Sequence, residues 1–252
     1  MTQRQAVRLT VTDHVASITL VDVARRNSLN PELVSQLADA CAEARADPAV
    51  RAVVLASEGP VFSAGGDIDS LGKPADDPTG VYRGFRALEA LPMPVLAAVH
   101  APVIGAGVNF LLACDVIVAG ASATFDPRFL DVAIHPGGGH FWRMRQRVGE
   151  QGTAAMVLFG DALTAGEAQE RGLIWRCVPD EELGAVVDRL TKRVAGRSPE
   201  LIRRAKATLT VTRGLTDPRM AAELEQIAQD WSMRQPAFTE AVAKLHDRIK
   251  NR

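Results

Sequence analysis

A unit of strand, loop and helix occurs twice in the first half of this 252-residue chain. In the first unit, Val15–Val21 alternates apolar and polar residues, and Asn30-Pro31 supplies a cap and a first-turn proline for the next helix. In the second unit, the strand-like Pro94–His100 leads through small residues to a helix over Ala106–Ala113. Two further buried strands are predicted after these helices, at Ala52–Ala56 and Val116–Ala119. Alternating strands and helices predict an α/β fold with a parallel or mixed sheet.

The pattern changes after about Gly137, where strand signals largely stop and helix starts take over. Ile174–Val178 is the one later strand candidate. Four helix starts carry a capping residue, a capping box or a proline: Thr164 with Glu167, Ser198-Pro199, Asp217-Pro218 and Gln235-Pro236. We therefore predict an α/β core over residues 1–195 and a helical C-terminal region over 196–252. We also predict a loop over Gly72–Gly80, which contains two prolines.

The composition excludes several classes of protein. Lys and Arg total 29 and Asp and Glu total 30, so no basic excess favours nucleic acid. No apolar run approaches the ~20 residues of a membrane span, and the N-terminus lacks the apolar stretch of a signal peptide. The three cysteines lack metal-site spacing and are interpreted as free thiols. These features favour a cytoplasmic protein without a metal or a membrane partner.

Two glycine-rich turns, Phe62–Ile68 and Val103–Asn109, are the strongest candidates for a functional site. Small residues allow a ligand to approach the backbone closely, and free N–H groups at a helix start point outward. Two such N–H groups that converge on one point would form an oxyanion hole. Either turn alone is better explained by tight packing than by function. A dinucleotide site is disfavoured because Gly105–Gly107 lacks the GxGxxG spacing.

Taken together, the two turns resemble those of the crotonase (enoyl-CoA hydratase/isomerase) superfamily. The similar segments, in chain order, are Ala24–Leu29, Phe62–Ile68, Pro94–Asp115, Pro136–Gly139, Leu163–Leu173 and Phe238–Arg248. The resemblance covers essentially the whole chain. It implies a crotonase-like spiral of repeated ββα units with a helical C-terminal region that mediates oligomerisation, as a homotrimer or a dimer of trimers.

The resemblance also implies the site residues. The backbone N–H groups of Gly66 and Ala106 fall on the positions of the oxyanion donors. Contacts to substrate or coenzyme A fall on Arg25, Ala64, Gly66, Asp67, Ile68 and Ala106. Asp69 stands where the family often has a basic residue. The implied ligand is an acyl-CoA thioester that serves as substrate, with no separate cofactor, in a setting such as fatty acid metabolism.

The sequence departs from the family at the catalytic carboxylates, whose positions fall on Asn109 and Phe129. An amide can orient water but cannot take its proton, and a phenyl ring can do neither. His140, His135 and Asp131 lie around the Pro136–Gly139 turn and are candidate replacements. Each has a structural interpretation as well, as a hydrogen-bonded turn residue or a salt-bridge partner.

Three functions remain open. The first is an enzyme of the enoyl-CoA hydratase/isomerase type, a lyase or an isomerase, that stabilises a thioester enolate. The second is a His-assisted hydrolase or retro-Claisen enzyme that cleaves a C–C bond. The third is an acyl-CoA binding protein without turnover.

Overall fold

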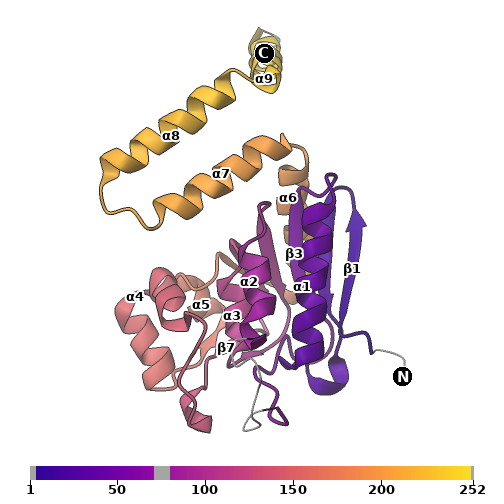
Figure 1. Cartoon of the computed structure of the whole chain (residues 1–252), viewed down its shortest axis with the longest axis vertical. Helices are drawn as coiled ribbons and strands as arrows, with labels where there is room; N and C mark the ends of the chain where they lie inside the picture. The colour runs from indigo at the N-terminus through magenta and orange to yellow at the C-terminus, as the bar shows by residue number, and fades with distance from the viewer. Residues whose placement is uncertain (1–3, 71–79, 251–252) are drawn as a thin grey trace. The chain divides into compact units, whose positions relative to one another are not determined.

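The computed structural model describes residues 4–70 and 80–250 and divides the chain into two compact units, Met1–Ala195 and Gly196–Arg252. Figure 1 traces both units along the chain. The loop predicted over Gly72–Gly80 lies outside the described residues, except for Gly80. Among the described residues, no helix is both long and apolar enough to cross a membrane.

A mixed sheet organises the first unit, as predicted. Its strands follow the order β1-β2-β3-β4-β6-β9 within the described part of the chain, and every neighbouring pair is parallel except β1 and β2. These strands are β1 (Val7–Thr12), β2 (Val15–Leu20), β3 (Ala52–Ser57), β4 (Val95–Val99), β6 (Val116–Gly120) and β9 (Arg176–Val178). A smaller sheet contains β5 (Val103–Ile104), β7 (Thr124–Asp126) and β8 (Leu163–Thr164).

Helices connect these strands, and local capping explains where several of them begin. Asn30 Oδ1 accepts a hydrogen bond from Leu33 N at 2.9 Å, and Thr164 and Glu167 form the predicted capping box. The helices of this unit are α1 (Pro31–Ala46), α2 (Arg83–Glu89), α3 (Gly107–Leu112), α4 (His140–Leu158), α5 (Ala165–Glu170) and α6 (Leu183–Ala195). Short 3-10 helices are η1 (Val23–Arg25), η2 (Gly80–Tyr82), η3 (Leu130–Val132) and η4 (Asp180–Glu182).

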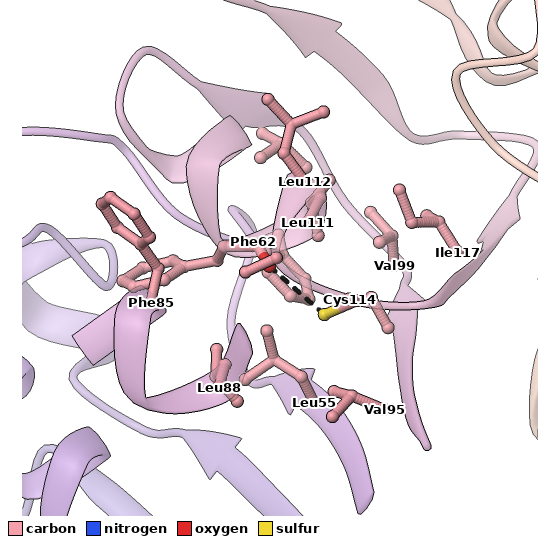
Figure 2. Packing of buried hydrophobic residues seen from close by; sticks show 14 of the residues in the cluster. Leu55, Phe62, Phe85, Leu88, Val95, Val99, Leu111, Leu112, Cys114 and Ile117 are labelled. Atoms are coloured by element: carbon pink, nitrogen blue, oxygen red, sulfur yellow. Dashed lines mark hydrogen bonds between the residues drawn. The ribbon is translucent and has the colours of Figure 1, made fainter. Parts of the chain in front are cut away.

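Alternating strand residues fill two separate layers of core, because successive side chains of a strand point to opposite faces. Val53 and Leu55 belong to the main core, with α1, α2 and α3, whereas Val54 packs in a smaller cluster with residues of α6. Figure 2 shows Phe85 and Leu88 of α2, and Leu111 and Leu112 of α3, gathered with strand residues in the main core. This packing anchors α3, which follows the second glycine turn.

The second unit contains α7 (Pro199–Thr212), α8 (Pro218–Met233) and α9 (Pro236–Lys250). The side chains of Ser198 and Asp217 cap α7 and α8, as predicted. The Arg204 guanidinium lies 3.9 Å from the centre of the Trp231 ring, which links α7 to α8. None of the described residues in these three helices is buried. Their exposed apolar side chains are Leu201, Leu209, Val211, Met220, Leu224, Ile227, Met233, Phe238, Leu245 and Ile249.

Candidate active site

The two glycine-rich turns lie against each other. Phe62 N donates to Pro102 O and Ile104 N donates to Ser63 O, both at 2.9 Å, so the turns run side by side. Gly65 has φ +82°, and a Cβ atom on it would lie 2.6 Å from Ile104 O and 3.1 Å from Ala106 N. The close approach therefore requires glycine at this position.

The predicted donors, Gly66 N–H and Ala106 N–H, lie on these adjoining turns. Among the described residues, neither amide donates a hydrogen bond to another protein group. Neighbouring amides are paired: Gly105 N donates to Asp126 O at 2.8 Å, and Val108 N donates to Gly105 O at 3.1 Å. The two adjoining turns thus leave two backbone donors for other acceptors.

The segment predicted to lie beside coenzyme A is tied to the first turn by hydrogen bonds. Ala64 N donates to Arg26 O at 2.9 Å, and Leu29 N donates to Gly65 O at 2.7 Å. Ser63 Oγ donates to the carbonyl of Asn27, which is buried. Arg25 and Ile68 are exposed, and Asp67 is half-buried. These hydrogen bonds therefore place side by side the two segments that carry the predicted contact residues.

Gly65→Ala tests the contact between the turns. A methyl group would clash with Ile104 O at a positive φ, so we expect a loss of about 1–3 kcal/mol of stability, measured by urea unfolding. Gly166→Ala is the matched control because a Cβ on Gly166, within α5, meets no atom within 4 Å. The control should be neutral or stabilising by up to about 1 kcal/mol. Equal stability of the Gly65→Ala variant and the wild type would refute the close approach.

Asn109, Phe129 and His140 form one buried cluster. His140 Nδ1 lies 2.9 Å from Asn109 Oδ1. The rings of Phe129 and His140 meet edge to face, with centroids 4.9 Å apart. Asn109 and Phe129, on which the resemblance places the family's carboxylates, therefore both contact the same histidine, which comes from the start of α4.

Burial is the main influence on His140. It lowers the pKa of the imidazole to about 4, and the positive charge of Arg143 contributes in the same direction. Arg143 itself is held by Glu89: its Nε and Nη2 lie 3.0 and 2.7 Å from the two carboxylate oxygens. Arg143 also donates to Gly138 O in the preceding turn. His140 is consequently neutral at pH 7.

The other two candidate replacements lie apart from this hydrogen-bonded pair. His135 is exposed, and its Nδ1 lies 2.8 Å from Pro136 O, which matches the structural interpretation of a turn histidine. Asp131 is exposed in η3. Asp126, at the end of β7, is paired with Arg128. Within the described chain, His140 is the one candidate of the three that hydrogen-bonds to Asn109.

The residues that hold the Pro136–Gly139 turn were not predicted. A Cβ atom on Gly137 would lie 2.0 Å from Tyr82 Oη, and one on Gly138 would lie 2.6 Å from Phe85. The turn thus packs directly against η2 and α2, with the Arg143–Glu89 pair as a second link. These contacts join residues about fifty positions apart, so no local pattern indicated them. The described residues include no cluster of His, Cys, Asp and Glu that could hold a metal ion.

The mixed sheet and its adjoining glycine turns define a class of α/β protein, and comparisons with known proteins identify the family. The family model for enoyl-CoA hydratase/isomerase matches residues 10–244. A probable enoyl-CoA hydratase of Mycobacterium tuberculosis, EchA14, is 36% identical, covering 98% of this chain and 100% of that protein. The 1,2-epoxyphenylacetyl-CoA isomerase of Escherichia coli is 32% identical, covering 72% of each chain.

Solved structures of similar proteins have the same fold as this chain. The crystal structure of a putative enoyl-CoA hydratase from Streptomyces coelicolor matches with a TM-score of 0.89 and 29% identity, covering 98% of this chain and 94% of that one. The chain belongs to the enoyl-CoA hydratase/isomerase family, within the crotonase superfamily.

Proposed function

We propose that this protein binds an acyl-CoA thioester and stabilises its enolate in an oxyanion hole formed by Gly66 N–H and Ala106 N–H. The observation that carries the proposal is the pair of adjoining turns whose two amides have no acceptor among the described residues. Relatives named for CoA thioesters, such as 1,2-epoxyphenylacetyl-CoA isomerase and 2,3-dehydroadipyl-CoA hydratase, support the choice of ligand.

The proposed chemistry follows from two hydrogen bonds to the thioester carbonyl oxygen. They withdraw electron density from the carbonyl, which acidifies Cα and makes Cβ of an enoyl group electrophilic. Each preorganised donor contributes about 3 kcal/mol to stabilising the negative charge in the transition state. The coenzyme A moiety would then lie along Arg25, Ala64, Asp67 and Ile68. The nearest reaction class is that of an enoyl-CoA hydratase or isomerase.

The carbonyl stretch of a bound thioester tests the hole without requiring turnover. Butyryl-CoA labelled with ¹³C at the carbonyl should show a lower stretching frequency when bound, by difference infrared spectroscopy, because both donors weaken the C=O bond. Ala106→Pro removes one donor at a residue whose φ of −64° already suits proline, and the shift should shrink or disappear. An unshifted carbonyl in the wild-type complex would contradict the proposal.

The C–C cleaving alternative is favoured by one observation, the contact of His140 with both Asn109 and Phe129. Its lowered pKa makes this imidazole a weak base, so we rank this alternative second. Release of a cleaved acid from a β-diketone or a β-keto thioester would support it. Thioester binding without any turnover would instead support the acyl-CoA binding protein.

We also propose that the second unit mediates self-association, as a trimer or a dimer of trimers. Its three helices expose many large apolar side chains, and exposed apolar surface of this extent marks an interaction site. Light scattering at micromolar concentration should give at least the mass of a trimer. Ile227→Glu, at a side chain that is 66% exposed, should dissociate it, whereas Glu225→Gln on the same helix should not. A monomeric wild type would contradict this prediction.

A further inference from the structure

His140 carries a buried nitrogen that lacks a partner. Its side chain is 1% exposed, and its Nδ1 lies 2.9 Å from Asn109 Oδ1. Its Nε2 is also buried, yet among the described residues it has no hydrogen-bond partner. A buried polar atom without a partner costs free energy, so such an atom in a folded protein indicates a functional role or a bound group.

The contact with Asn109 determines which ring nitrogen carries the proton. An amide oxygen can only accept a hydrogen bond, so Nδ1 is the N–H donor and Nε2 keeps its lone pair. Burial and Arg143 disfavour the doubly protonated ring, and the adjoining rings of Phe129 and Phe141 carry no charge. Glu89, the carboxylate that pairs with Arg143, is engaged with its guanidinium. Nε2 is therefore a neutral acceptor.

The position of this acceptor is set by α3. Asn109 lies in the first turn of that helix, and its backbone N donates to Ala106 O at 3.1 Å. Helical side chains lean toward the N-terminus of their helix, so the Asn109 side chain leans toward the second glycine turn. The pair formed by Asn109 and His140 thus lies beside the turn that carries Ala106 N–H.

We propose that His140 Nε2 accepts a hydrogen bond from a hydroxyl group on the acyl chain, and that Asn109 is the positioning residue that keeps this nitrogen unprotonated. The proposal rests on the proposed function, because the hydroxyl belongs to a bound CoA thioester. It names a substrate class: thioesters whose acyl chain carries a hydroxyl near the carbonyl. A saturated acyl chain of the same length leaves Nε2 without a partner, and this difference gives the site its selectivity.

Calorimetric titration tests the selectivity with a matched pair of ligands, 3-hydroxybutyryl-CoA and butyryl-CoA. The wild-type protein should bind the hydroxyacyl thioester about tenfold more tightly or better, because the unpartnered acceptor is then satisfied. His140→Phe keeps an aromatic ring against Phe129 and should abolish the preference while still binding both thioesters. His246→Gln, at an exposed site on α9, should keep it.

The outcomes separate this inference from the proposed function. Equal affinity of the wild type for both ligands overturns the role of His140 and leaves thioester binding standing. Failure to bind either thioester overturns both.

Nitrogen-15 NMR of labelled histidine tests the tautomer without any ligand. The His140 signals, assigned by their loss in His140→Phe, should show a protonated Nδ1 and an unprotonated Nε2 at pH 7. A proton on Nε2 would overturn the proposal.

Asn109→Asp provides a second test of the positioning role. A carboxylate still accepts from Nδ1–H but stabilises the imidazolium, so the pKa of His140 should rise. The preference for the hydroxyacyl thioester should then become pH-dependent and weaken as the pH falls, because the protonated Nε2 can no longer accept. A preference unaffected by pH in this variant would contradict the role of Asn109.

Discussion

The wild-type protein is expected to hydrate crotonyl-CoA weakly or not at all, even while it binds the thioester. Hydration needs a base that deprotonates water and an acid that protonates Cα, and each correctly placed group contributes about 10² to 10⁴ in rate. Asn109 and Phe129 supply neither group. The loss of the enoyl absorbance measures the rate of crotonyl-CoA hydration directly.

Placing carboxylates at both positions should raise the rate of crotonyl-CoA hydration. Asn109→Glu with Phe129→Glu should increase hydration by about 10²-fold or more, provided that the two backbone donors act as proposed. The two new carboxylates would lie near each other, because both residues contact the same buried ring of His140. Asn109→Gln with Phe129→Gln is the matched control: it supplies the same side-chain length without a titratable proton and should stay at the wild-type rate.

Fast hydration by the wild type, unaffected by Asn109→Ala, would show that another group performs the proton transfers. His140, His135 and Asp131 would then be tested in turn, beginning with His140→Ala. Within the described chain, only His140 among these three is seen to contact both Asn109 and Phe129.

Local signals explain which parts of the fold could be predicted. Four helix starts could be predicted because a cap acts within three residues of itself. The capping residues are Asn30, Thr164, Ser198 and Asp217. The strands β5 and β8 were missed because a two-residue strand has no periodicity. Helix α2 was missed because its N-cap, Tyr82, makes no side-chain capping bond.

The features of the site also divide into local ones, which could be predicted, and contacts between distant residues, which could not. The two glycine turns could be located from their own small residues, and the resemblance to the family assigned the oxyanion donors to them. The contact between Asn109 and His140 joins residues 31 positions apart, and the Arg143–Glu89 pair joins residues 54 positions apart. Both contacts depend on the direction in which α4 leaves the Pro136–Gly139 turn. In this turn, Gly138 and Gly139 have positive φ angles. Sequence periodicity carries no information about that direction.

Acid should destabilise this protein through His140. Its pKa falls from an ordinary value of 6.5 to about 4 on folding, so the unfolded chain binds a proton more readily than the folded one. Stability is therefore retained above pH 6.5 and lost as the pH falls toward 4. Between pH 6.5 and pH 4, His140 lowers the free energy of unfolding by about 3 kcal/mol, since each pKa unit corresponds to about 1.4 kcal/mol.

Replacing His140 with phenylalanine isolates this contribution from that of the carboxylates, which also respond to acid. The free energy of unfolding, measured with urea at pH 7 and at pH 4, should fall by about 3 kcal/mol less in His140→Phe than in the wild type. His246→Gln, which removes an exposed histidine, should preserve the full wild-type dependence. If His140→Phe and the wild type lose the same stability between the two pH values, then His140 does not stay neutral in the folded protein, and the neutral acceptor inferred for its Nε2 is lost with it.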